Sequence, residues 1–351
     1  MENLNHPTTD QTGVQPQYSP PPPQALSRGT GKPRTLRGRL EYMGCGLLIY
    51  MFIVLGIQMT DMIFHIVYFF VLSYSGKADY DELFAEYQVT VYENAVPMIV
   101  GVIIGIAAMI LYFIKAMPVK QVFERHKKMT FPKLIMLISV LMGCQLIFLF
   151  LDEGVEKLLN LVGLSLQTAI ESSQAGSKTV SMFLYAGFIG PIAEEIIYRG
   201  FVMHTFEKAD CGKVCSILVS ALLFGVMHAN PTQSVFALYV GLVFAYTAME
   251  YGIIWSIALH IINNFLFGDV LTFIINKLPE TAGNILGYTV FIITFIAGLI
   301  VLIAKRKFII SFIRENRTPE KTYGTIFTCI SILIFIFFNL VMAVLQVRPL
   351  K

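Results

Sequence analysis

The chain has 351 residues, of which 56% are apolar and 14% are charged. Soluble domains are about 45–50% apolar and about 25% charged, so this composition excludes an ordinary soluble domain and predicts a protein that crosses a membrane several times. The formal charge of +3 is too small to indicate a nucleic-acid partner. The five cysteines include no C-x-x-C pair, so neither a disulfide framework nor a thiolate zinc site is expected.

The N-terminal segment is rich in proline and basic residues and has too few apolar side chains to build a core. This composition predicts a disordered arm over residues 1–40. The first apolar run begins near Met43, which is too far from the N-terminus for the apolar part of a cleaved signal peptide. We therefore interpret that run as a membrane span.

Long apolar runs follow one another along the rest of the chain. A crossing helix needs about 20 residues, and runs of about this length occur at 43–66, 95–114, 134–151, 180–206, 213–229, 233–250, 253–273, 284–304 and 325–346. The predicted fold class is an all-α polytopic transmembrane helix bundle of about eight or nine helices.

Basic residues gather in the arm and in two of the loops between spans. These clusters include Arg37 and Arg39, then Lys120 and Lys127, then Lys305 to Lys321. All three fall on one side of the membrane if the spans are as predicted, and the bias of Lys and Arg toward the inside predicts that this side is cytoplasmic. We expect a multi-pass protein of the cell membrane with a cytoplasmic N-terminus. The side of the C-terminus depends on the number of spans.

Three of the apolar runs contain polar residues that a bilayer core disfavours. An ionisable group there costs about 2.5–3.5 kcal/mol on insertion scales, so each one requires an explanation. The residues are Glu194, Glu195 and Arg199 in the run at 180–206, His228 at the end of the run at 213–229, where Phe224 precedes it by four residues, and His260 and Asn264 in the run at 253–273.

Their spacing predicts which of them cooperate. Glu195 and Arg199 are four residues apart, with the acid first, which is the favourable order for an ion pair on one helical face. Glu194 points about 100° away and is left for another partner. His260 and Asn264 share one face of their own helix in the same way, and Phe224 and His228 repeat this spacing.

The functional groups also lie at similar depths. Counting about 1.5 Å per residue from the inner turns places Glu194 and Asn264 roughly 18 Å deep, His228 roughly 22 Å and His260 roughly 12 Å. This coincidence predicts one polar site near mid-membrane, built by three helices. Gly190 and Pro191 precede the glutamates, and because proline frees a backbone carbonyl that only protein or water can satisfy, we expect a kinked helix beside a wet cavity.

A carboxylate that faces an imidazole can position a water molecule and take its proton. A second histidine and an asparagine could stabilise the oxyanion that forms when water adds to a carbonyl. No serine or cysteine is placed as a nucleophile. The pattern therefore favours amide hydrolysis by activated water.

These motifs, Glu194-Glu195-x-x-x-Arg199, Phe224-x-x-x-His228 and His260-x-x-x-Asn264, resemble those of the CPBP family of intramembrane proteases. This family includes CAAX prenyl proteases and bacteriocin-processing enzymes and is also called the abortive-infection family. The resemblance covers about residues 180–270 and implies a glutamic endopeptidase.

The resemblance also implies a role for each matched residue. Glu194 would be the base, and Glu195 and His228 would assist the water. His260 and Asn264 would stabilise the oxyanion, and Arg199 would be a structural partner of the glutamates. No cofactor is implied, and the substrate would be a peptide or lipidated peptide in membrane lipid. The predicted domains are the arm at 1–40, N-terminal helices at 41–179, a catalytic core at 180–273 and C-terminal helices at 274–351.

Other interpretations stay open. Glu195 and Arg199 can be a buried structural pair, and Phe224 can be core packing. Two histidines and two glutamates could instead ligate zinc in a metal-dependent membrane protease. Buried carboxylates and histidines also suit a proton-coupled transporter or a membrane scaffold. The oligomeric state and the choice between a prenylated tail and a leader peptide or bacteriocin are not predicted.

Overall fold

The computed structural model describes residues 35–75, 83–84, 86–87, 93–117, 119–124, 127–174, 177–318 and 320–350. Residues 1–34 of the predicted arm lie outside this range. The last residues of the predicted arm, 36–40, are instead the first turns of helix α1 (Leu36–Tyr74). The helix begins there because the Thr35 hydroxyl accepts a hydrogen bond from the backbone N–H of Gly38.

Seven helical segments of the described chain are long and apolar enough to cross a membrane. They are α1, α3 (Val96–Phe113), α5 with α6 (Phe131–Met142 and Gln145–Asn160), the segment Val180–Lys208, α12 (Pro231–Tyr251), the segment Ile253–Lys277 and α15 (Glu280–Glu315). The predicted multi-pass helical bundle is therefore confirmed.

Two of the nine predicted spans are shorter than expected. Helices α11 (Lys213–Met227) and α17 (Ile330–Val344) have 15 residues each, which is about 22 Å and less than the roughly 30 Å of a hydrocarbon core. The Glu41 carboxylate accepts hydrogen bonds from the backbone N–H groups of Ile330 and Ser331 at the start of α17. Because protein satisfies these backbone groups, α17 need not begin at the lipid interface.

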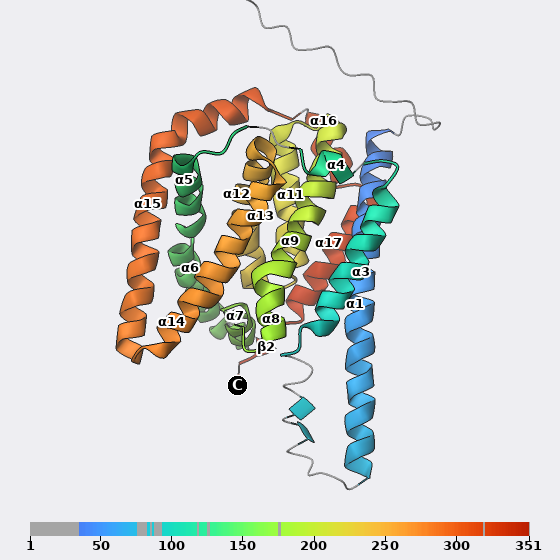
Figure 1. Cartoon of the computed structure of the whole chain (residues 1–351), viewed down its shortest axis with the longest axis vertical. Helices are drawn as coiled ribbons and strands as arrows, with labels where there is room; N and C mark the ends of the chain where they lie inside the picture. Colours follow the sequence, from blue (N-terminus) through green and yellow to red (C-terminus); the bar gives the residue numbers. More distant parts are fainter. Residues whose placement is uncertain are drawn as a thin grey trace, which may run out of the picture. The chain divides into compact units, whose positions relative to one another are not determined.

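Helix α11 lies at the centre of the described bundle, where it packs mainly against α12 (Figure 1). Helix α1 contacts both α3 and α17 on one side, and α15 packs against α5 on the other. The remaining elements are short: α4 (Val119–Val122), α7 (Gln167–Gln174), α16 (Glu320–Ile326), and a two-stranded antiparallel sheet of β1 (Leu164–Ser165) and β2 (Arg348–Pro349).

Three π-helical segments interrupt the helices that carry the polar residues. The segment Val180–Lys208 runs as α8 (Val180–Leu184), η1 (Tyr185–Ile189), α9 (Gly190–Glu195), η2 (Ile196–Met203) and α10 (His204–Lys208). The segment Ile253–Lys277 runs as α13 (Ile253–Ile261), η3 (Ile262–Val270) and α14 (Leu271–Lys277). The break expected at Gly190 and Pro191 thus takes the form of wider turns, which are frequent at functional sites.

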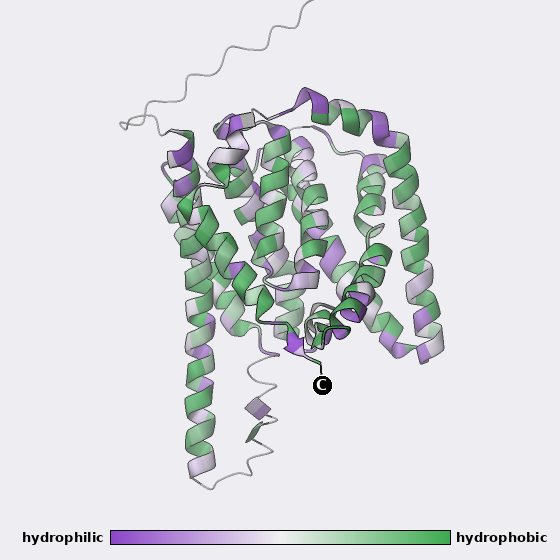
Figure 2. Ribbon diagram, turned by 180° about the vertical axis from the view of Figure 1, so that it is seen from behind, coloured by the Kyte–Doolittle hydropathy of each residue, from purple (hydrophilic) through white to green (hydrophobic). Residues whose placement is uncertain are grey.

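The predicted basic clusters lie at one end of the bundle. Arg37 donates a hydrogen bond to the carbonyl of Thr328, and Lys208 donates one to the side chain of Gln121. In Figure 1, α4 and α16 mark this end, and β2 lies at the opposite end, close to the C-terminus. Figure 2 shows hydrophilic residues along the last turns of α15, at the same end as α16, and mostly apolar surfaces on the helices between the two ends.

Candidate active site

The two adjacent glutamates at the end of α9 point to different surroundings. The Glu195 side chain is fully buried, whereas the Glu194 side chain keeps 15% of its surface exposed. Glu195 Oε2 lies 3.2 Å from Arg199 Nε and accepts a hydrogen bond from the Ser256 hydroxyl. Glu195 Oε1 lies 3.0 Å from Nδ1 of His260. Glu195 is therefore held by three partners and has no freedom to move toward a substrate.

Arg199 completes a buried structural pair with Glu195, as the structural interpretation predicted. Its Nη2 donates to the backbone carbonyl of Gly241 at 3.0 Å, and its guanidinium lies 4.5 Å from the centre of the Phe224 ring. A side chain at position 241 would not fit, because a Cβ there would lie 2.9 Å from the Phe224 ring. Phe224 is a buried residue of the main apolar core, and its ring also packs against the guanidinium.

His260 connects both glutamates. With Nδ1 on Glu195, its Nε2 lies 3.6 Å from Oε2 of Glu194, and its ring stacks on Phe244 with centres 4.5 Å apart. The residue is only 3% exposed. The imidazole is held by the ring stacking and by the Nδ1 contact, and its Nε2 faces Glu194.

His228 follows the last residue of α11 and has one ring nitrogen committed. Its Nδ1 lies 2.9 Å from the backbone carbonyl of Phe224, and a carbonyl can only accept, so Nδ1 carries a proton. In the neutral ring, Nε2 then holds a lone pair. No described residue hydrogen-bonds Nε2, which leaves it available to accept a proton or a hydrogen bond.

A cavity of about 450 Å³ lies in front of these residues. Glu194, His228 and Asn264 all line it, as do Gly190 and Pro191, so the cavity expected beside Glu194 is present. Glu195 and His260 do not line the cavity and lie behind Glu194. Its remaining wall comes largely from α1, α3 and α17 through apolar side chains, including Met51, Val54, Val102, Phe335 and Met342.

Asn264 is oriented by its neighbours on η3 and η1. Its Nδ2 donates to the carbonyl of Ala186 at 3.0 Å, and its Oδ1 accepts from Nδ2 of Asn263 at 2.9 Å. An amide nitrogen has two N–H donors. The second N–H of Asn264 is not hydrogen-bonded to any described residue, and the Asn264 side chain lies in the cavity wall.

The comparison with known families bears on this same region. Residues 176–266 match the family of type II CAAX prenyl endopeptidase Rce1-like proteins. This confirms the resemblance to CAAX proteases seen in the three motifs, and all seven predicted site residues lie within the match. No curated protein and no solved structure matches the chain with significance.

The Rce1-like match supports a CAAX-type endopeptidase, which is a protease and hydrolase, within a multi-pass membrane protein. The match covers about a quarter of the chain. It includes the helices that carry Glu194, His228 and Asn264. It does not include α1, α3 and α17, which supply the apolar wall of the cavity.

Sequence analysis missed several residues that shape the site of this Rce1-like segment. Ser256 bonds Glu195, Asn263 bonds Asn264, and Tyr198 lines the cavity. For Ser256 and Tyr198, a four-residue spacing from a predicted site residue was the available signal. Ser256 lies four residues before His260, and Tyr198 lies four residues after Glu194.

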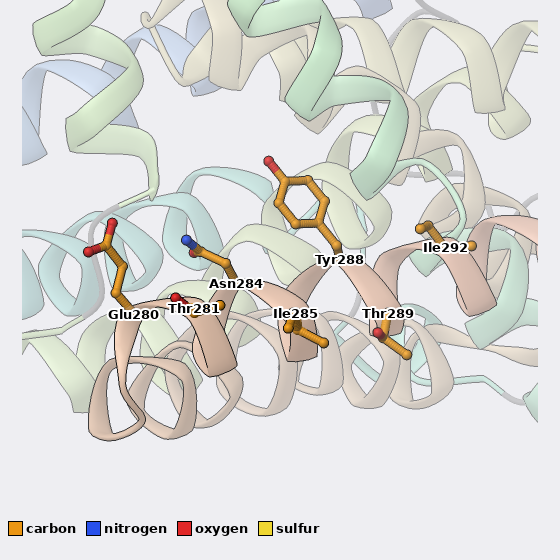
Figure 3. Close-up of a pocket in the computed structure, with 7 residues that line it drawn as sticks. All are labelled: Glu280, Thr281, Asn284, Ile285, Tyr288, Thr289 and Ile292. Atoms are coloured by element: carbon orange, nitrogen blue, oxygen red, sulfur yellow. The ribbon is translucent and has the colours of Figure 1, made fainter.

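A second hollow lies on α15 and is separate from this site. Figure 3 shows its lining, all of it from the first turns of that helix: Glu280, Thr281, Asn284, Ile285, Tyr288, Thr289 and Ile292. Glu280 is its only ionisable acid and no histidine lines it. This hollow therefore does not offer the paired groups that hydrolysis needs.

The side chains of the described residues do not form a ready metal site. No group of three or more His, Cys, Asp or Glu side chains in the described part of the chain is placed to hold one ion. Beside Glu194, the Glu195 carboxylate is hydrogen-bonded to Ser256 and to the imidazole of His260 and is ion-paired with Arg199, and these partners compete for the oxygen lone pairs that a metal would use.

Proposed function

We propose that this protein is an intramembrane glutamic endopeptidase that cleaves membrane-associated peptides with a water molecule activated by Glu194. The observation that carries the proposal is that Glu194 and His228 line one cavity while Glu195 is held by Arg199, Ser256 and His260. Of the two neighbouring carboxylates, only Glu194 has access to a bound water and a substrate.

The reaction follows from the groups around the cavity. Glu194 takes a proton from water while the Nε2 of His228 hydrogen-bonds the same molecule, and the water oxygen bonds to the peptide carbonyl carbon. The carbonyl oxygen gains negative charge and accepts a hydrogen bond from the free N–H of Asn264. The C–N bond then breaks, and Glu194 returns the proton to the leaving nitrogen. One peptide and one water become an acid and an amine, with Glu194 restored.

His260 and Glu195 have an indirect part in this scheme. The resemblance assigns to His260 the stabilisation of the oxyanion. In the structure, its Nε2 lies 3.6 Å from Oε2 of Glu194. We propose that His260 orients Glu194 and, when charged, stabilises its carboxylate. Glu195 sets the tautomer and position of His260 through the 3.0 Å contact at Nδ1.

We propose a peptide with a lipidated, CAAX-type C-terminus as the substrate. The family named in the match acts on prenylated tails, and the cavity wall formed by α1, α3 and α17 is mostly apolar, with Gln58 and Asn339 as polar exceptions. Such a wall suits an isoprenoid chain, because burial of apolar surface contributes about 25 cal/mol per Å². A leader peptide or bacteriocin would be the alternative substrate.

We favour metal-independent catalysis, because Glu195 is already held by His260, Arg199 and Ser256, which leaves Glu194 as the one cavity-lining carboxylate of the pair. A zinc-dependent protease is the alternative. Dialysis against a strong chelator should leave activity unchanged, with no zinc in the purified protein by elemental analysis. Loss of activity that zinc restores would favour the alternative.

The test of the proposed function is cleavage by the purified protein in liposomes. The probe is a synthetic peptide that ends in a farnesylated cysteine followed by three residues, and the products are identified by mass spectrometry. The wild-type protein should release the terminal tripeptide, whereas Glu194→Ala and His228→Ala variants with the wild-type melting temperature should not. Equal cleavage by either variant would refute the proposal.

A further inference from the structure

Tyr198 lies in the wall of the candidate active site without a function in the scheme above. It is four residues after Glu194, at the start of η2, and both residues line the same cavity. Its spacing from Glu194 places it on nearly the same face of the segment. The Tyr198 side chain therefore faces whatever binds in front of Glu194.

The Tyr198 hydroxyl is buried and has no hydrogen-bond partner among the described residues. The residue has 0% of its surface exposed, and its ring meets the edge of Phe224 with centres 5.5 Å apart. The hydroxyl of Ser220 donates to the Tyr198 backbone carbonyl at 2.8 Å. Backbone and ring are thus both fixed, so the hydroxyl cannot turn away to find another partner.

An unpaired buried hydroxyl is unfavourable, because it has lost its hydrogen bonds to water and gained none in the protein. Phenylalanine would fill the same space without this penalty. The hydroxyl is therefore better explained by a partner that arrives in the cavity than by packing. Peptide carbonyl oxygens are the acceptors that a peptide substrate would bring, and a phenol donates readily to them.

We propose that the Tyr198 hydroxyl donates a hydrogen bond to a backbone carbonyl of the bound peptide and so positions it over Glu194. This inference rests on the proposed function, since it assumes a peptide in the cavity. It makes Tyr198 a substrate-binding residue that the three motifs do not include.

The chain offers a matched control in Tyr239. Its hydroxyl donates to the carbonyl of Val140 at 2.8 Å, and the residue does not line the cavity. The Tyr239→Phe change therefore removes a hydrogen bond that the protein makes by itself. The Tyr198→Phe change removes no hydrogen bond to any described residue.

The experiment compares Tyr198→Phe and Tyr239→Phe in a Glu194→Gln background, which should bind the peptide without cleaving it. Melting temperature and the Kd of the farnesylated peptide are measured in nanodiscs, and cleavage is followed separately in proteins that keep Glu194. We expect Tyr198→Phe to keep or raise the melting temperature and to weaken peptide binding about tenfold. Tyr239→Phe should lower the melting temperature and leave the Kd unchanged.

Two results would overturn the inference. Equal Kd values with and without the Tyr198 hydroxyl would show that it does not touch the peptide. A Tyr198→Phe variant whose melting temperature falls as much as that of Tyr239→Phe would show that the Tyr198 hydroxyl already has a hydrogen-bond partner within the protein. Binding without cleavage by the wild-type protein would refute the proposed function alone, whereas absence of binding would refute both.

Discussion

His260 Nδ1 lies 3.0 Å from Oε1 of Glu195, and this contact connects two helices that are distant in sequence. The other ring nitrogen of His260 lies 3.6 Å from Oε2 of Glu194, so a single imidazole lies between two adjacent carboxylates. Arg199 and Ser256 also bind Glu195, whereas Glu194 lines the cavity. Two chemically identical side chains therefore receive different roles from their surroundings.

Ser256 tests the positioning of Glu195. The Ser256→Ala variant loses a hydrogen bond to a buried charged group, and we expect a stability loss of about 1.5–3 kcal/mol. Because Glu195 and His260 would lose part of their orientation, kcat should also fall by about tenfold. Both quantities can be measured by thermal unfolding in detergent and by cleavage of the farnesylated peptide.

Ser216 is the matched control for that variant. It is also a fully buried serine, and its hydroxyl donates to the carbonyl of Gly212 at 2.9 Å, in the first turn of α11 and twelve residues before His228. Ser216→Ala should reduce stability and leave kcat unchanged. A similar fall in kcat for both variants would mean that stability alone explains the effect.

Another prediction concerns the contribution of the buried Glu195–Arg199 ion pair to the free energy of unfolding. Both side chains are completely buried, so Arg199→Met leaves an uncompensated carboxylate and should cost about 3–5 kcal/mol. Glu195→Gln combined with Arg199→Met should cost clearly less than the sum of the single changes, because neither variant group then carries a buried charge. Additive losses in this double-mutant cycle would contradict an energetically coupled pair.

The two ring nitrogens of His228 are predicted to have separate roles, Nδ1 in holding the side chain and Nε2 in contacting the water. In a His228→Asn variant the side-chain amide can still donate to the carbonyl of Phe224, but no group remains at the Nε2 position facing the cavity. We expect a melting temperature near that of the wild type and a kcat reduced about 100-fold, within the range of lost acid–base assistance. Retention of full activity would show that Nε2 does not contact the water.

Much of the site could be predicted from the sequence, since local spacing determines it. The four-residue spacing of Glu195 and Arg199 predicts their ion pair, and the Gly190-Pro191 pair predicts the adjacent cavity. The four-residue spacing of Ser256 and His260 places both on one face of α13, but the hydrogen bond from Ser256 to Glu195 could not be predicted, because it depends on how α13 packs against α9. The short length of α17 could not be predicted either, since a protein partner at a helix end and a lipid interface leave the same apolar pattern.

The membrane orientation is a separate prediction. The basic end of the bundle, with α4 and α16, should be cytoplasmic, and the end with β2 should face the opposite side. An impermeant maleimide applied to intact cells should label a Leu350→Cys variant and should not label Lys321→Cys until the membrane is opened. The wild-type protein, which has its own cysteines, is the control for background labelling. The reverse pattern would contradict this orientation.

The most direct test of the account is the kcat of Glu194→Gln, compared with Glu195→Gln in the same membranes. Glu194→Gln keeps the size of the side chain and removes the base, so we predict wild-type affinity for the farnesylated peptide, a wild-type melting temperature, and a kcat at least about 100-fold lower. Glu195→Gln should lower the melting temperature, because it removes the charge that Arg199 and His260 bind. A Glu194→Gln protein that cleaves the peptide within a few-fold of the wild-type rate would contradict the role of Glu194 as the base.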